Sequence, residues 1–131
     1  MLEEMIRLGG LCNISLVVFH LMFWRLFDWQ QDLRSLSWVN RAIMQVMNLS
    51  LILIFLIFGY LSLGYPRELL DSELGQRLLL LMALFWFARA MQQILFFQLK
   101  HWISQVFLLV FLGIALLYAI PAGSVLRPLW N

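Results

Sequence analysis

The side chains that could do chemistry in this sequence lie inside long apolar stretches. Arg89 is the most distinctive of them, because a guanidinium in apolar surroundings needs a partner for its charge. Phe96 follows seven residues later, on the same face if the segment is a helix. The remaining polar candidates for a site are His20, Arg41, Gln45, Asn48, Gln92 and Gln93.

Arg89 has no acidic neighbour in these stretches, since every Asp and Glu lies outside them. Its partners must therefore be neutral acceptors such as Asn48 or Gln93, water, or an anion that is not part of the chain. One interpretation is a structural arginine bonded to glutamine and asparagine amides across a helix interface. The other is an arginine that binds a carboxylate or a phosphate, which guanidinium groups recognise in a bidentate manner.

The other candidates have simpler interpretations. The amide side chains are typical of interhelical hydrogen bonds, worth about 0.6 kcal/mol each in a bilayer. His20 alone is more typical of a hydrogen-bonded core residue than of a ligand, and His101 lies in a loop, so a bis-histidine haem site has little support. Cys12 is the only cysteine, which excludes an intrachain disulfide. No Ser-His-Asp, zinc or paired-carboxylate constellation is present.

The composition indicates where these residues must reside. Of the 131 residues, 63% are hydrophobic and only 12% are charged, whereas a soluble domain is nearer half apolar and a quarter charged. The formal charge of +2 comes without any basic run, so nucleic acid is not an expected partner. The sequence therefore predicts an integral membrane protein in contact with the lipid bilayer.

Four apolar stretches are long enough to cross a bilayer as helices. They are residues 8–27, 42–63, 78–99 and 102–120. They predict an all-α, antiparallel four-helix transmembrane bundle that forms one domain over residues 1–131, with both termini on the side of the second loop. Loops one and three are predicted to be cytoplasmic, because the basic residues of that side lie close to the span ends. Those residues are Arg25, Arg34, Arg41 and Lys100.

The depth of the polar residues predicts a cavity in one half of the bilayer. At 1.5 Å per residue, the His and amide side chains lie within roughly 5 to 12 Å of the side of loops one and three, and Arg89 lies about 14 to 15 Å deep. The opposite half is nearly all apolar apart from Asn13, and Tyr118 is assigned there to an aromatic belt at the interface. We therefore expect a polar cavity open toward loops one and three and closed beneath by an apolar plug.

Two short patterns resemble the MAPEG family, the membrane-associated proteins in eicosanoid and glutathione metabolism. The second span has Arg41 seven residues before Asn48, and the third span has Arg89, as those four-span proteins do. The resemblance implies a homotrimer that binds glutathione or a lipid-like anion between subunits, in the half facing loops one and three. It further implies glutathione-dependent transferase or isomerase activity.

The chain also departs from the family pattern. Gln92 stands where histidine is usual, Phe96 where tyrosine is usual, and Leu51 where a glutamate is expected. The family's arginine near the start of the fourth span has no counterpart around Ser104. These departures favour a non-catalytic or re-purposed relative as much as an enzyme.

Three functions follow from these observations. The first is a small membrane protein that holds an anionic or amphipathic ligand with Arg89 and the neighbouring amides. The second is a non-enzymatic accessory subunit of a larger membrane complex, in which the polar residues bond helices together. The third is a small anion channel or transporter, against which the apolar half and the lack of helix breaks in the second and third spans both count.

Overall fold

The fold was examined in a computed structural model that describes residues 1–126. The described part is all-α, and four of its helices are long and apolar enough to cross a membrane. These are α1 (Leu2–Leu21), α4 (Trp38–Gly64), α6 (Glu73–Phe96) and α7 (Trp102–Leu126). The connections contain α2 (Phe23–Leu26), α3 (Trp29–Asp32), the 3₁₀ turn η1 (Leu33–Ser35) and α5 (Pro66–Asp71). The predicted fold class is thereby confirmed.

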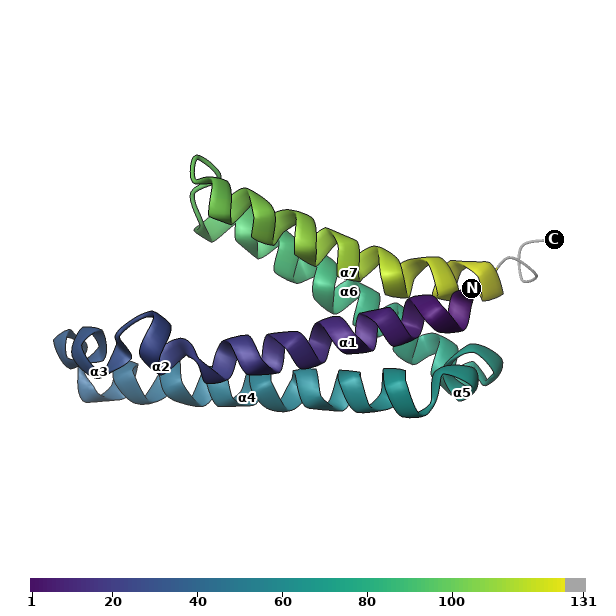
Figure 1. The fold of residues 1–131 in the computed structure, drawn as a ribbon, viewed down its shortest axis with the longest axis horizontal. Coiled ribbons are helices and arrows are strands. Elements are labelled where there is room, and N and C mark those ends of the chain that lie inside the picture. Colours follow the sequence, from purple (N-terminus) through teal and green to yellow (C-terminus); the bar gives the residue numbers. More distant parts are fainter. Residues whose placement is uncertain (127–131) are drawn as a thin grey trace.

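The four long helices form two antiparallel hairpins. In Figure 1, α1 lies along α4 and α6 lies along α7. The hairpins come together at the end that carries the start of α1, the last turns of α7 and α5, and they diverge toward loops one and three. The first residues and the end of α7 are therefore on the same side, as predicted.

Helices α4 and α6 begin before the apolar stretches that predicted them. Ser37 caps α4 by accepting a hydrogen bond from the Asn40 backbone N–H at 3.4 Å, and Ser72 caps α6 by accepting one from Gly75 at 2.9 Å. A serine at this position satisfies an otherwise unpaired N–H of the first turn. The hydropathy pattern therefore located the bilayer-crossing part of these two helices, while the capping serines determine where the helices begin.

The first apolar stretch is not one continuous helix. Helix α1 begins at Leu2 and ends at Leu21, and the chain then enters α2. Phe23 stacks on His20 with ring centroids 4.4 Å apart and meets Trp29 edge-on at 5.5 Å. The last part of the predicted span therefore forms a separate short helix, whose Phe23 ring packs between His20 of α1 and Trp29 of α3.

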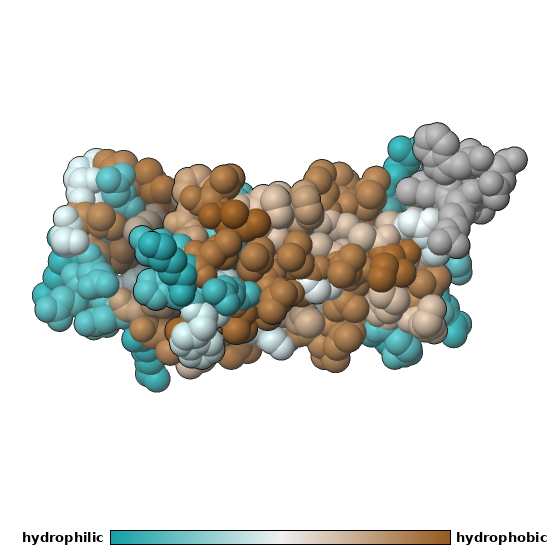
Figure 2. Space-filling model, turned by 90° about the horizontal axis from the view of Figure 1, so that it is seen from above, coloured by the Kyte–Doolittle hydropathy of each residue, from teal (hydrophilic) through white to brown (hydrophobic). Residues whose placement is uncertain are grey.

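The outside of the bundle is apolar along most of its length. Figure 2 shows hydrophobic side chains over the middle of the visible face and most hydrophilic ones toward its two ends. Only about a third of each candidate span is buried inside the chain, for example 28% of the window in α4. Such a surface is stable only against lipid or other apolar segments, which makes this an integral membrane protein.

Candidate functional site

A stack of three aromatic rings joins the two hairpins near mid-depth. Phe55 of α4 stacks on Trp86 of α6 with centroids 5.3 Å apart, and Trp86 stacks on Phe111 of α7 at 5.8 Å. All three side chains are buried. We call these three residues the aromatic floor, because the hairpins diverge from it toward loops one and three.

Arg89 lies one helical turn beyond Trp86, on the side of the diverging hairpins. Its guanidinium carbon is 4.4 Å from the centre of the Phe111 ring and 5.6 Å from that of Phe97. Its Nη1 is buried and has no hydrogen-bond partner. The ion pairs found among residues 1–126 join other arginines to Glu3 and Glu73. Within the described residues, the Arg89 guanidinium thus contacts two aromatic rings and forms no ion pair with a carboxylate.

Asn48 and His20 face the floor from the other hairpin. Asn48 Nδ2 donates to the backbone carbonyl of His20 at 3.1 Å, which ties α4 to α1. Since a carbonyl can only accept, this bond fixes the amide orientation and directs Oδ1 elsewhere, where it is buried and unpaired. The His20 ring lies 2.9 Å from the Leu16 carbonyl and meets Phe55 edge-on at 5.0 Å.

Gln45 and Arg41 are engaged in holding loop one. Gln45 accepts a bond from Trp24 Nε1 and donates to the Arg41 carbonyl, both at 3.3 Å. The Arg41 guanidinium donates to three backbone carbonyls in and next to η1, at 2.9 to 3.4 Å. The hydrogen bonds of these two predicted site residues therefore go to loop one and to its flanks, and none of them goes to Arg89.

The predicted polar face of α6 divides into two. Gln93 is 3% exposed and donates to Ser104 Oγ of α7 at 2.9 Å. Gln92 is exposed, and Phe96 is 80% exposed. Adjacent residues on a helix point about 100° apart, so Gln93 turns toward α7 while Gln92 and Phe96 lie on an open face.

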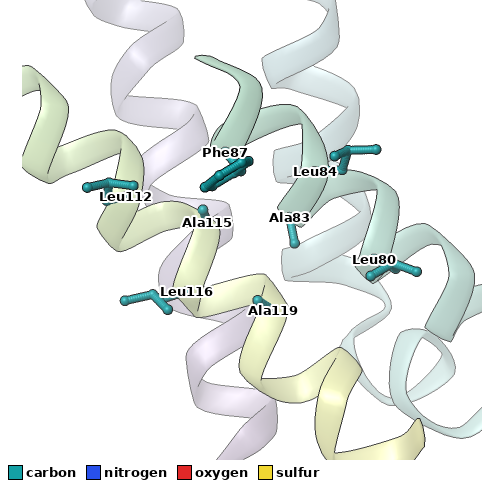
Figure 3. Close-up of a pocket in the computed structure, with 8 residues that line it drawn as sticks. All are labelled: Leu80, Ala83, Leu84, Phe87, Leu112, Ala115, Leu116 and Ala119. Carbon is teal, nitrogen blue, oxygen red and sulfur yellow. The ribbon is translucent and has the colours of Figure 1, made fainter. Parts of the chain in front are cut away.

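Two apolar grooves lie on the surface of α7. One, of about 440 Å³, runs between α6 and α7 and is shown in Figure 3, with alanine and leucine side chains on its walls. Another, of about 410 Å³, lies between α1 and α7. Neither of these two grooves is lined by any of the predicted site residues, so the expected polar cavity coincides with neither of them.

The half expected to hold only an apolar plug contains a buried polar cluster. Asn13 Nδ2 donates to the Tyr118 hydroxyl at 2.9 Å and to the Gly9 carbonyl at 2.8 Å. The Tyr118 hydroxyl also bonds Ser62 Oγ at 2.8 Å. The assignment of Tyr118 to an interface belt was wrong, because the ring packs on Gly9, where no side chain intervenes, and is fully buried. Asn13 and Ser62 on the buried helix faces were the signal for this cluster.

Three buried side-chain atoms of α4 and α6 have no hydrogen-bond partner, namely Arg89 Nη1, the indole N–H of Trp86 and Asn48 Oδ1. Of these, the Arg89 guanidinium carries a charge and complements an anionic group such as a carboxylate or a phosphate. Within the described residues, no group of His, Cys, Asp and Glu is placed to bind a metal ion. Comparison with protein-family models, curated proteins and solved structures finds no match to this chain.

Proposed function

We propose that this chain is a membrane-embedded binding protein for an anionic amphiphile, whose carboxylate or phosphate pairs with Arg89. The observation that carries the proposal is the buried, unpartnered Nη1 of a guanidinium within a membrane-spanning helix. An arginine at the centre of such a helix costs about 2.5 kcal/mol or more, and Arg89, about 10 Å from the end of α6 at Phe96, bears part of that cost. A bound anion would offset that cost.

The alternative of a structural arginine requires amides to solvate it. None of the hydrogen bonds made by these amides among the described residues involves Arg89. Gln45 Oε1 accepts from Trp24, while the amide nitrogens of Gln93 and Asn48 donate to Ser104 and to the His20 carbonyl. The guanidinium instead lies against the rings of Phe111 and Phe97, and its Nη1 has no hydrogen-bond partner.

The proposed ligand has two chemical sources. The resemblance to MAPEG proteins favours glutathione, with a homo-oligomer of this chain as the functional form. The apolar helix surfaces favour a bilayer amphiphile with one acidic head. Both present a carboxylate or phosphate to Arg89, so the same protein variants test them.

Thermal unfolding of the detergent-purified protein tests the proposal. Glutathione, oleate and lysophosphatidate are titrated separately, and oleyl alcohol serves as the uncharged match for oleate. A ligand present at 100 times its dissociation constant stabilises the folded state by about 2.7 kcal/mol. We expect at least one anion to raise the melting temperature by several degrees, and oleyl alcohol to leave it unchanged.

The matched variants are Arg89→Gln and Arg25→Gln. Arg25 is an exposed arginine near the same end of the molecule. Arg25→Gln therefore changes the net charge by the same amount as Arg89→Gln and leaves the site intact. The stabilisation should vanish in Arg89→Gln and persist in Arg25→Gln. Equal stabilisation of both variants, or an effect of oleyl alcohol equal to that of oleate, would refute the proposal.

A second candidate, an accessory subunit, is favoured by the exposed strip of Gln92 and Phe96 on α6. A glutamine facing lipid lacks hydrogen-bond partners that a neighbouring subunit could supply. Gln92→Leu would then release a co-purifying membrane partner without altering any response to anions. Purification of the chain alone, with full anion binding, would count against this function.

A further inference from the structure

Aromatic rings join α4 and α6 at the floor and beside it. Phe55 meets Trp86, and Phe58 meets Phe85, each pair with centroids 5.3 Å apart. On the other side of the molecule, Phe19 of α1 meets Phe107 of α7 at 5.5 Å. Beyond the floor the two hairpins diverge toward loops one and three (Figure 1), and we call the region between the diverging parts of α4 and α6 the opening.

Arg89 lies on the face of α6 that borders this opening. Phe85, Arg89, Gln92 and Phe96 are spaced by four, three and four residues, which places them along one side of a helix. Phe85 at the lower end of that side touches α4. The same side therefore continues toward loop three as the α6 wall of the opening, with Arg89 nearest the floor.

The facing wall of α4 is apolar and adaptable. Counting back from Phe58, Leu51, Met47 and Met44 fall on its side of the helix. Met44 is 40% exposed and Met47 is 60% exposed, so neither is covered by another helix of this chain. Methionine side chains are flexible and polarisable, and they suit surfaces that must accommodate varied apolar groups.

We infer that the ligand of Arg89 is a lipid-borne amphiphile with a single acidic head, which reaches the arginine sideways from the bilayer between α4 and α6. The inference rests on the proposed function and specifies its ligand. The head pairs with Arg89, and the tail stays against Met44 and Met47 in the hydrocarbon. Arg89 lies seven residues, or about 10 Å, below the end of α6 at Phe96. A water-soluble anion would have to pass the apolar Phe96 and Phe97 to reach it.

Photolabelling in phosphatidylcholine vesicles tests this route, with a fatty acid that carries a diazirine in its tail as the probe. We expect severalfold more adducts on Met44 and Met47 than on Leu49 and Leu53, which lie on the opposite side of α4 and are 53% and 58% exposed. Excess oleate should remove this preference, and so should Arg89→Gln. Glutathione should leave it unchanged.

Two bulky variants examine the opening directly. Met47→Trp narrows it, and Leu49→Trp adds the same ring to the lipid-facing side. Preferential labelling should fall severalfold in Met47→Trp and remain in Leu49→Trp, with Met44→Trp repeating the test if Met47→Trp does not fold. Equal labelling of both sides of α4, unaffected by Arg89→Gln, would show annular lipid only and overturn the inference.

The thermal titrations separate the two failures. If glutathione stabilises the protein in an Arg89-dependent way while labelling shows no preference, the proposed function stands and the lateral route is wrong. If no anion stabilises the protein through Arg89, both fail together.

Discussion

The two ends of this bundle treat buried polar groups in opposite ways. At the closed end, Asn13, Ser62 and Tyr118 bond to one another and tie α1, α4 and α7 together, leaving one unpaired acceptor, Asn13 Oδ1. At the aromatic floor and toward the open end, the unpaired atoms belong to Trp86, Asn48 and Arg89, and Arg89 carries a charge.

This difference separates the part that specifies the fold from the part available for a ligand. A satisfied buried network stabilises one arrangement of helices, whereas an unsatisfied buried group costs free energy until something binds it. Substitutions at the closed end should therefore lower stability. Replacing Arg89, the unpartnered cation at the open end, should raise stability and abolish binding.

The largest effect is expected at Gly9, where the closed end has no spare room. A Cβ at Gly9 would lie 2.8 Å from a ring carbon of Tyr118 and 3.0 Å from its hydroxyl, so the buried ring would have to move. Overpacking of this kind costs about 1–3 kcal/mol. We expect Gly9→Ala to lower the free energy of unfolding by that amount, measured by SDS titration in mixed micelles.

Gly113→Ala is the matched control, because a Cβ there meets nothing within 4 Å. Alanine is the better helix former by up to about 1 kcal/mol, so this variant should be neutral or slightly stabilised. A Gly9→Ala protein as stable as Gly113→Ala would show that the Tyr118 ring can shift at no cost. It would contradict the claim that packing at the closed end specifies the fold.

A smaller loss is expected for Tyr118→Phe. The change removes the hydroxyl that accepts from Asn13 and bonds Ser62, and it leaves both partners buried without their mutual link. Unsatisfied groups of this kind cost about 1–3 kcal/mol in proteins, and the lower part of that range suits a bilayer, where hydrogen bonds are weaker. SDS titration should show a loss of about 1 kcal/mol.

Tyr60→Phe removes a hydroxyl from the same half of the bundle without touching the cluster. Tyr60 is 62% exposed, and its hydroxyl bonds only that of Tyr65, at 3.2 Å. Its free energy of unfolding should stay at the wild-type value. A Tyr60→Phe loss as large as that of Tyr118→Phe would argue that hydroxyl burial does not distinguish the two positions.

The opposite sign is expected for Arg89→Leu. The change removes an unpartnered cation, which costs at least about 2.5 kcal/mol at a bilayer centre. It also removes two contacts between the cation and aromatic rings, each of which stabilises the protein by about 0.5–1 kcal/mol. Because Arg89 is only partly buried, we expect a net gain near 1 kcal/mol in the absence of ligand. A loss of stability in the same SDS titration would instead assign Arg89 to the scaffold.

The sequence predicted the arrangement of α4 more fully than that of α6. Asn48, Ile52, Phe55, Gly59 and Ser62 are spaced by three or four residues, which places them on one face of a helix, and these are the buried residues of α4. Helix α4 packs mainly on one neighbour, α1, so a single periodic stripe describes it. That much of the fold follows from the pattern of polar and apolar residues alone.

Helix α6 has neighbours on several sides, and its pattern is correspondingly ambiguous. Trp86 contacts both α4 and α7, while Gln92 and Gln93 differ by only one step around the helix. Which glutamine meets Ser104 depends on the rotation of α6 against α7, and periodicity does not fix that rotation. The buried position of Tyr118 was not predicted for a related reason. A tyrosine near the end of a span can lie in an aromatic belt at the interface or inside the bundle as a partner of Asn13, and its place in the sequence does not distinguish the two.

The adjacent glutamines provide the smallest and most local test of the comparison. Gln93 is buried and bonded to Ser104, whereas Gln92 is exposed on the wall of the opening. Gln93→Leu should lower the free energy of unfolding by about 0.6 kcal/mol, the average for an interhelical hydrogen bond in a bilayer, and leave ligand-induced stabilisation intact. Gln92→Leu should not lower stability, because it removes a polar group from an apolar surface, but it should weaken oleate binding if the amide contacts the head. The same pair of measurements, SDS titration and oleate-dependent melting, thus separates the two roles at neighbouring positions. If Gln93→Leu changed binding and Gln92→Leu changed only stability, Gln93 and not Gln92 would border the ligand, and α6 would be rotated relative to its observed position.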